Sequence, residues 1–418
     1  MKPDRKKRVC VLGSGNWGTV IAKIVGSNSL NSEILQERVS MYVYEEELED
    51  GRKLSEVINE RHENVKYLPG HELPPNVVAV TDATEAVRGA DVLVFVMPRQ
   101  FVRTLCATLV GQIKPTAVGV SLIKGFDDED GPLDLVSNTI ARFGLNPGPS
   151  NTRLSRSTDK RSLMCWCLLG FYRPARVIQV VRRGANKHKS DVEVRLPPRY
   201  LKIRMCVLMG ANNANEVAAE KLAETTIGCK DKRLVPLLKA IFQTDNFKVR
   251  PEINRETNVV ACAAGFVDGL ELGSNAKAAV VRLGLLEMVR FVDNLYPGSR
   301  LGTFFQSCGV ADLMTTCYGG LRDSRVAAEF AKSGRALAEL EEEMLGGRKL
   351  QARGRGGPGT RTAFEVNRFL TEKKMEEQFP LFTAVHLAAT GVVPPNAVLQ
   401  CVRDAPDYTP MVRNLLVM

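Results

Sequence analysis

Three glycines near the amino terminus have the spacing that binds a nucleotide diphosphate. Gly13, Gly15 and Gly18 form the pattern G-x-G-x-x-G directly after the apolar run Val9–Leu12, and an apolar-rich helix is predicted from Thr19. The first glycine permits a tight turn, the second lets backbone approach a pyrophosphate, and the third lets helix pack on strand. The N–H groups at the helix start then face the phosphates. The pattern predicts a dinucleotide site rather than a purely structural turn, with these candidate contacts: Gly13, Ser14, Gly15, Asn16, Trp17 and Gly18.

The acidic residue after the second predicted strand bears on the choice of dinucleotide. This strand covers residues 39–44 and runs into Glu45. An acid at the end of the second strand binds a ribose hydroxyl in such folds, but the interval from the glycines is usually about 20 residues and is longer here. Glu45 is therefore either a ribose ligand or part of a solvated acidic turn. No arginine follows directly to hold a 2′-phosphate, which favours NAD over NADP.

Strands and helices alternate along the first half of the chain. Buried strands are predicted at 77–80, 91–96, 117–123 and 205–209, with helices at 81–90 and 101–109. This order is typical of a parallel doubly wound sheet, whose ligands bind beyond the carboxyl ends of the strands. Pro98, Phe101 and Lys124 fall at such ends.

From about Pro251 the pattern becomes helical, with helices predicted at 275–291, 326–330, 336–345, 362–370 and 381–389. We predict an α/β protein in which an N-terminal Rossmann-like sheet, residues 1–250, precedes an all-α C-terminal domain, residues 251–418. In such a plan the substrate lies in the cleft between the domains.

Composition narrows the class of protein. The chain has 418 residues, 44% of them hydrophobic, which suffices for two domains. It has no apolar run long enough to span a membrane and no signal-peptide pattern at its start. Its ten cysteines form no disulfide framework, so we expect a reduced, cytoplasmic protein. No metal site is predicted.

The net charge of +10 is concentrated in one segment. Residues 151–204 carry 14 Lys and Arg against 3 Asp and Glu, a net charge of +11, so the rest of the chain sums to −1. The surrounding stretch 146–204 has no sustained period of 2 or 3.6 residues and no nucleic-acid motif. We interpret it as a disordered insertion in the first domain; a basic arm for nucleic acid or membrane is the alternative. No nucleic-acid partner is predicted.

Many uncommon words occur in collinear order over about 300 residues. They include HENVKYLPGHELPPNVVAV (62–80), SLIKG (121–125), CVLMGAN (206–212), ETTIGCKD (224–231), AAGFVDGLELGSNAKAAVVRLGLLEM (263–288) and SCGVADLMTTCYGG (307–320). Together with the glycine loop they resemble the NAD-dependent glycerol-3-phosphate dehydrogenases of the eukaryotic cytosolic type. The resemblance implies an enzyme that interconverts dihydroxyacetone phosphate plus NADH and sn-glycerol 3-phosphate plus NAD. It also implies a homodimer.

The resemblance assigns roles to particular residues. Lys124 matches a lysine shared by substrate binding and chemistry, and Asp312 and Thr316 match members of the active-site network. Asn258 matches a substrate contact and Arg322 the arginine that binds the phosphate of the substrate and contacts the cofactor. The remaining cofactor positions are matched by Tyr44, Phe101, Ala214, Lys349 and Gln351.

One position departs from the family. A segment containing the proton-transferring lysine is shortened here, and Thr257 occupies the position of that lysine. A threonine hydroxyl is no general acid near neutral pH, whereas a partly buried lysine is one. We therefore expect impaired catalysis. The alternatives are a catalytically dead NAD-binding homologue and, among active enzymes, another two-domain β-hydroxyacid dehydrogenase.

Overall fold

The computed structural model describes residues 5–124, 126–127, 134–142, 179–181, 193–195, 203–251, 258–295, 301–319, 322–344 and 358–405.

The first part of the chain, up to residue 251, is built around an eight-stranded sheet. The sheet order is β12-β11-β10-β5-β4-β1-β2-β3. Its strands are β1 (Val9–Leu12), β2 (Val39–Tyr42), β3 (Val77–Val80), β4 (Val92–Phe95), β5 (Val118–Ser121), β10 (Arg204–Gly210), β11 (Ala223–Gly228) and β12 (Phe247–Pro251).

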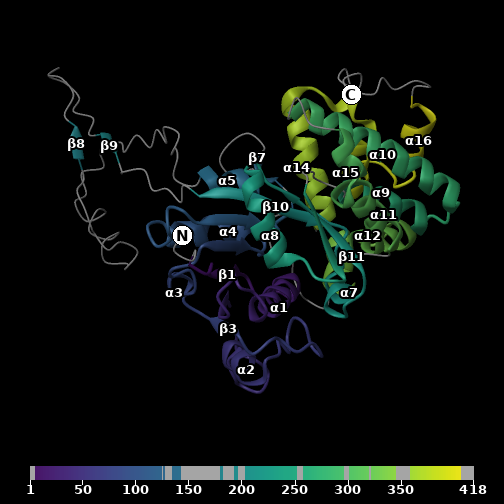
Figure 1. The fold of residues 1–418 in the computed structure, drawn as a ribbon. Helices are drawn as coiled ribbons and strands as arrows, with labels where there is room; N and C mark the ends of the chain where they lie inside the picture. The colour runs from purple at the N-terminus through teal and green to yellow at the C-terminus, as the bar shows by residue number, and fades with distance from the viewer. Residues whose placement is uncertain are drawn as a thin grey trace, which may run out of the picture.

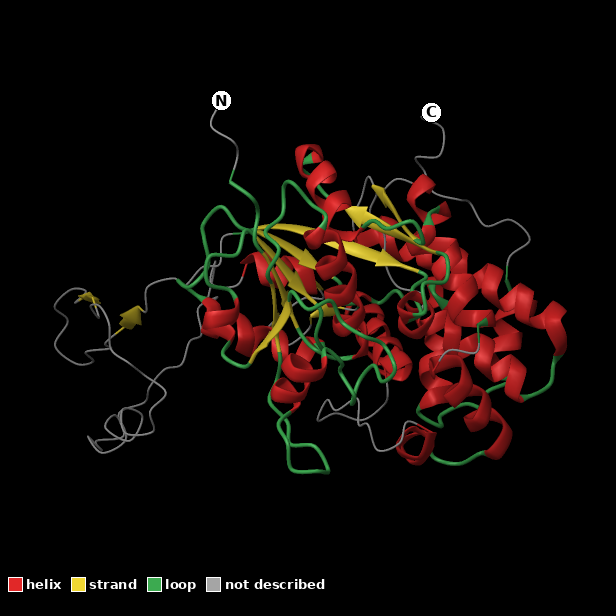
Figure 2. Ribbon diagram, turned by 60° about the horizontal axis from the view of Figure 1, so that its bottom comes forward, coloured by secondary structure: helices red, strands yellow, loops and turns green. Residues whose placement is uncertain are grey.

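Helices cover both faces of this sheet (Figure 2). β1 shows why its strands are continuous apolar runs: Val9 and Val11 face one core while Cys10 and Leu12 face the other, and all four are buried. The first core takes side chains from α1 (Asn16–Leu30), α2 (Leu54–Arg61), α7 (Ala214–Ala218) and α8 (Val235–Phe242). The second takes them from α3 (Ala83–Ala86), α4 (Val102–Leu109) and α5 (Val136–Arg142).

The predicted parallel doubly wound sheet is confirmed, with one addition. The six strands from β3 to β10 pair in parallel. β11 runs antiparallel to β10, and β12 is parallel to β11. These two strands are not among those predicted from the sequence. β11 is rich in polar residues, and its buried Thr225 and Thr226 are held by hydrogen bonds rather than by apolar contacts.

Every described helix or turn of helix after β12 belongs to a second, helical part, which lies beside the sheet in Figure 1. Helix α9 (Asn258–Gly269) lies at its centre, because residues 259–267 are buried throughout. The predicted all-α C-terminal part is confirmed. The other helices are α10 (Gly273–Leu295), α11 (Asp312–Tyr318), α12 (Arg322–Ser333), α13 (Leu337–Met344), α14 (Pro358–Lys373), α15 (Pro380–Ala389) and α16 (Ala397–Arg403).

The basic stretch 146–204 lies mostly outside the described residues. Within it, β8 (Gln179–Val181) pairs antiparallel with β9 (Glu193–Arg195), and β10 begins at Arg204. Among the helices that the structure describes, none has both the length and the apolar character needed to cross a bilayer.

Candidate active site

The glycine loop joins β1 to α1 with backbone packed on backbone. Gly13 has φ +131°, and a Cβ there would lie 2.2 Å from the Val96 carbonyl oxygen. A Cβ on Gly18 would lie 2.3 Å from the Gly13 carbonyl oxygen. Both distances are far below contact, so only glycine fits at these two positions. This is the tight turn and the close helix–strand approach that the sequence pattern predicts.

The start of α1 is open. Gly15 is the N-cap residue and offers no side chain to the first N–H groups, and the first turn of α1 carries no acid. A Cβ on Gly15 would meet nothing within 4 Å, so the backbone borders free space. Unpaired N–H groups and the positive end of the helix dipole at such a place suit a phosphate. The residues present therefore fit a nucleotide diphosphate.

Two side chains of the loop have structural contacts of their own. The Trp17 indole packs edge-on against Phe247 of β12, with ring centroids 6.2 Å apart. The Asn16 amide donates to the Asn215 side chain on α7 over 3.1 Å. Because Ala214 is the first residue of α7, this bond brings a further predicted cofactor residue to the loop.

Two aromatic side chains are exposed after β2 and β4, the strands on either side of β1. Tyr44 follows β2 and is 74% exposed, and Phe101 follows β4 and is 55% exposed. Large exposed rings at the carboxyl ends of strands are suited to contact a ligand there. Glu45 instead accepts hydrogen bonds from the backbone N–H and the hydroxyl of Ser55, at 3.1 and 2.6 Å. Its carboxylate thus holds the first turn of α2.

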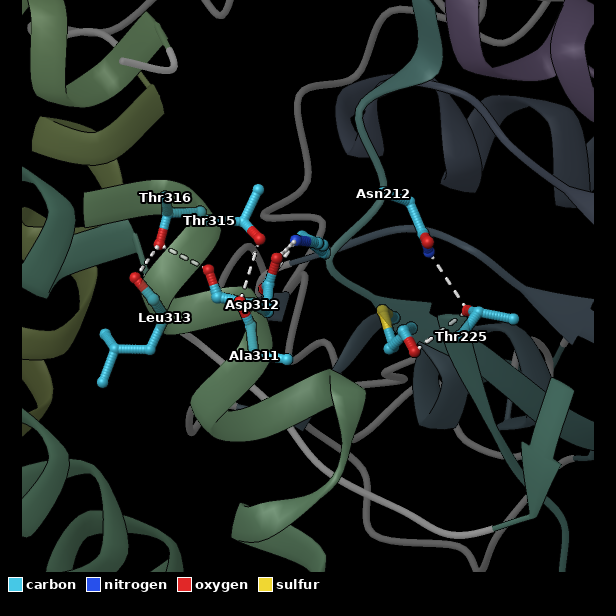
Figure 3. Close-up of polar contacts among 9 residues, drawn as sticks. Asn212, Thr225, Ala311, Asp312, Leu313, Thr315 and Thr316 are labelled. Carbon is cyan, nitrogen blue, oxygen red and sulfur yellow. Dashed lines mark hydrogen bonds and ion pairs between the residues drawn. The ribbon is translucent and has the colours of Figure 1, made fainter. Parts of the chain in front are cut away.

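Lys124 and Asp312 meet across the boundary between sheet and helical part. Lys124 follows β5, and Asp312 is the first residue of α11. The Lys124 ammonium donates to both carboxylate oxygens of Asp312, at 2.7 and 3.0 Å (Figure 3). The Asp312 side chain is 7% exposed and that of Lys124 is 42% exposed. A buried carboxylate needs such a partner, while the partly exposed ammonium stays accessible to a ligand.

Thr316 lies one turn after Asp312 on α11 and is buried. Its hydroxyl donates to the backbone carbonyls of Asp312 and Leu313, at 2.8 and 3.1 Å (Figure 3). The hydroxyl thus belongs to the same short helix as the carboxylate and stiffens its first turn.

Sequence reasoning missed a set of hydroxyl and amide contacts beside this pair. Asn212, just after β10, bonds to the Thr225 hydroxyl of β11 over 3.1 Å (Figure 3). Thr226, the next residue, shares a buried 2.8 Å hydrogen bond with Ser307, which begins the turn leading to Asp312. The words CVLMGAN, ETTIGCKD and SCGVADL were the available signal, because each carries at least one of these residues.

Five predicted residues have no described side chain. Asn258 is the first residue of α9 and Arg322 the first of α12, so only their backbone placement is described. Thr257, Lys349 and Gln351 lie outside the described residues. Among the side chains that the structure does describe, no three His, Cys, Asp or Glu gather as a metal site would require.

The chain was compared with known proteins. Residues 8–147 match the model for the NAD-dependent glycerol-3-phosphate dehydrogenase N-terminus, and residues 256–400 match the model for the C-terminus. The cytoplasmic NAD(+) glycerol-3-phosphate dehydrogenase of Drosophila melanogaster is 48% identical over 412 residues, covering 96% of this chain and 95% of the relative. The Rattus norvegicus enzyme of the same name is 43% identical, covering 96% and 99%.

Solved structures agree. The glycerol-3-phosphate dehydrogenase of Saccharomyces cerevisiae is 33% identical and superposes with a TM-score of 0.74, covering 96% of this chain and all of that one. The match thus includes both the sheet and the helices. The chain belongs to the NAD-dependent glycerol-3-phosphate dehydrogenase family.

Proposed function

We propose that this protein interconverts dihydroxyacetone phosphate, NADH and a proton with sn-glycerol 3-phosphate and NAD. Family membership supports the reaction. The observation that carries it is the contact between Lys124 and Asp312, which places an accessible ammonium at the same sheet edge as the glycine loop. A small phosphorylated substrate beside that ammonium lies between the two parts of the molecule.

The residues have separate tasks in this reaction. NAD supplies the hydride acceptor or donor. The amide groups at the start of α1 bind its diphosphate, the backbone at Ala214 adjoins them, and Tyr44 and Phe101 flank it. Lys124 binds and polarises the substrate oxygen, oriented by Asp312, whose own backbone is held by Thr316.

The other substrate and cofactor contacts come from the helical part. Arg322 is assigned to the substrate phosphate, because a guanidinium binds phosphate with two parallel hydrogen bonds. Asn258 is assigned to the substrate and Lys349 and Gln351 to the cofactor. These four assignments rest on the match of each position to a residue of the family.

Proton transfer to the substrate oxygen is the step that we expect to be slow. Thr257 stands where the family has its proton-transferring lysine, and a hydroxyl does not replace an ammonium as general acid. Turnover is therefore expected to be low while NADH binding is kept. This same observation favours the second candidate function, a catalytically dead NAD-binding homologue.

Following NADH absorbance with dihydroxyacetone phosphate tests both candidates. We expect slow oxidation by the natural chain and a rise in kcat of about 10²–10⁴-fold in Thr257→Lys, the usual contribution of a general acid. Thr257→Met is the control for side-chain length without a proton. NADH binding with no turnover in either protein would establish the dead homologue, and absence of NADH binding would refute both proposals.

Removing the carboxylate of Asp312 tests the carrying observation. In Asp312→Asn the Lys124 ammonium loses the charge that orients it, so kcat/KM should fall by about 10²-fold with the NADH dissociation constant unchanged. Asp404→Asn is a matched control: Asp404 is exposed at the end of α16, and among the described contacts its side chain accepts a hydrogen bond from Gln400 only. Equal turnover in Asp312→Asn and the natural chain would contradict the role.

We further propose that the chain divides near residue 250 into an NAD-binding domain, residues 1–250 with the insertion 146–204, and a helical substrate domain, residues 251–418. The hydrophobic clusters of the sheet and of the helices share no residue, which supports this division. A cytoplasmic homodimer is proposed on the resemblance to cytoplasmic relatives. Light scattering during size-exclusion chromatography measures the oligomeric state.

A further inference from the structure

A second ion pair crosses the boundary between sheet and helices, away from Lys124. The Arg99 guanidinium binds the Glu365 carboxylate with two parallel hydrogen bonds, one of 2.7 Å from Nη1 to Oε2 and a second between Nη2 and Oε1. The Arg99 side chain is 14% exposed and that of Glu365 is 3% exposed. The two residues are 266 positions apart in the sequence. No motif in the sequence indicates this pairing.

Arg99 lies at the cofactor edge, by which we mean the carboxyl ends of the parallel strands, where the glycine loop also lies. It begins a short 3₁₀ turn, Arg99–Phe101, that follows β4 by way of Pro98. The Phe101 N–H donates to the Pro98 carbonyl over 3.1 Å, so Arg99 and the exposed Phe101 ring share one turn of backbone. A force that holds the Arg99 side chain therefore also holds the turn that presents Phe101.

Glu365 lies on a helix that packs into the helical core. It lies on α14 between Ala363 and Val366, both of which are buried in the helical core. A bidentate arginine–carboxylate pair fixes direction as well as distance, unlike a lysine contact. Arg99 is thus attached to a helix that does not move independently of the helical core.

The two boundary ion pairs start from neighbouring strands. Arg99 follows β4 and pairs with α14, and Lys124 follows β5 and pairs with α11. β4 and β5 are adjacent and parallel, so both cations lie at the same edge of the sheet. Two separated attachment points between rigid bodies restrict rotation in a way that one alone does not.

We propose that Arg99 and Glu365 are positioning residues. Their ion pair fixes the helical part against the cofactor edge, so that the Phe101 turn and the meeting of Lys124 with Asp312 keep one geometry before any ligand binds. This inference rests on the proposed function for its effect on NADH, but its geometric part concerns the protein alone. Because the boundary is already ordered, NADH binding does not have to supply the free energy of ordering it.

Two variants and one charge reversal test the proposal by NADH fluorescence titration. Arg99→Lys keeps the charge but loses the fork, and Glu365→Gln keeps the shape but loses the charge. We expect each to raise the NADH dissociation constant by about tenfold. The double variant R99E/E365R should restore most of the affinity. Matched controls on the exposed pair of Arg335 and Glu343, Arg335→Lys and Glu343→Gln, should leave it unchanged.

A second measurement needs no NADH. Spin labels on non-natural side chains at the exposed positions Leu30 and Val392, one in each part of the molecule, report the distance between the two parts. We expect a narrow distance distribution in the natural chain, a broad one in Arg99→Lys and Glu365→Gln, and a narrow one again in R99E/E365R.

The outcomes separate the two proposals. Folded variants with the distance distribution and NADH affinity of the natural chain would show that the ion pair is only structural. A natural chain that does not bind NADH would refute the proposed function, while the distance measurement would still decide the positioning role. If Glu365→Gln does not fold, Arg99→Lys, which buries no unpaired charge, decides it.

Discussion

Helices α1 and α15 differ in what binds the unpaired N–H groups of their first turns. At α15 the first N–H groups are satisfied from within, because the Glu287 carboxylate accepts from Leu381 and Phe382 at 2.8 and 2.9 Å and is 1% exposed. At α1 no side chain caps the helix, and the backbone at Gly15 faces open space. Both helices offer the same partial positive charge.

The difference shows which helix start has N–H groups that can bind a ligand. The Glu287 carboxyl group is a permanent part of the helical core, where it accepts the two N–H groups at the start of α15. At the start of α1 no side chain uses the first N–H groups, so their hydrogen-bonding capacity is left for a phosphate. Exchanging these two solutions is the sharpest way to test that reasoning.

The largest effect is expected when α1 receives an acid of its own. Gly15 has φ −66° and ψ −178°, a conformation open to any residue, and its side-chain space is free. In Gly15→Asp the new carboxylate caps the helix and repels the diphosphate. We expect the NADH dissociation constant to rise by about 10²-fold, equal to about 2.7 kcal/mol, and the thermal stability to be unchanged.

Gly15→Asn is the matched control, because its side chain caps the helix with the same shape and no charge. It should weaken NADH binding less than the acid does. Unchanged NADH affinity in Gly15→Asp, measured by calorimetry, would mean that the diphosphate lies elsewhere.

The next effect concerns the carboxylate at α15. Burial raises the pKa of Glu287 to about 7, while its two backbone hydrogen bonds act in the opposite direction. A folded-state pKa above the ordinary 4.5 means that the fold favours the protonated acid. Its stabilising contribution is complete below pH 4.5 and is lost as the pH rises through 7. The free energy of unfolding should therefore fall by about 2 kcal/mol between pH 5 and 7.5 on account of this group.

Denaturant titrations of the natural chain and Glu287→Gln across this range isolate the effect, because all other titrating groups are shared. The difference between the two proteins should change with pH in this window. Parallel pH profiles would show that Glu287 does not titrate there.

The smallest effect is expected at α3. This helix is capped by a side chain, as α15 is, but the capping residue is exposed. Asp82 caps this one-turn helix from the adjacent position, accepting from the N–H groups of Thr84 and Glu85 at 2.7 and 3.0 Å. Asp82→Ala should cost about 1 kcal/mol of unfolding free energy, and Asp82→Asn much less. NADH affinity should be the same in both, since this cap serves the fold alone. A loss of affinity in Asp82→Ala would remove the distinction between structural and ligand-binding helix starts.

The sequence predicted what local patterns determine. β1 and β3 have the predicted bounds. These elements are continuous apolar runs or short motifs, so neighbours in the sequence decide them. β11 was not predicted because tertiary hydrogen bonds, not an apolar run, hold its Thr225 and Thr226 inside. β12 was not predicted because only two of its described side chains, Phe247 and Val249, are buried and apolar, and the exposed Lys248 separates them.

The site divides in the same way. Spacing alone indicated the glycine loop, whose function lies in its backbone. Lys124 and Asp312 are 188 residues apart, and only the family words connected them before the structure placed them in contact. Nothing in the sequence connected Arg99 with Glu365, which are 266 residues apart, and only the structure placed them in contact.

The nesting of three backbone segments at the glycine loop limits what sequence change can do there. Gly18 lies against the Gly13 carbonyl, and Gly13 lies against the Val96 carbonyl, so the end of one strand, the turn and the first helix are stacked without side chains between them. Saturation mutagenesis with selection for a folded product should return glycine alone at positions 13 and 18. At position 15 it should return many residue types until the selection also demands the cofactor.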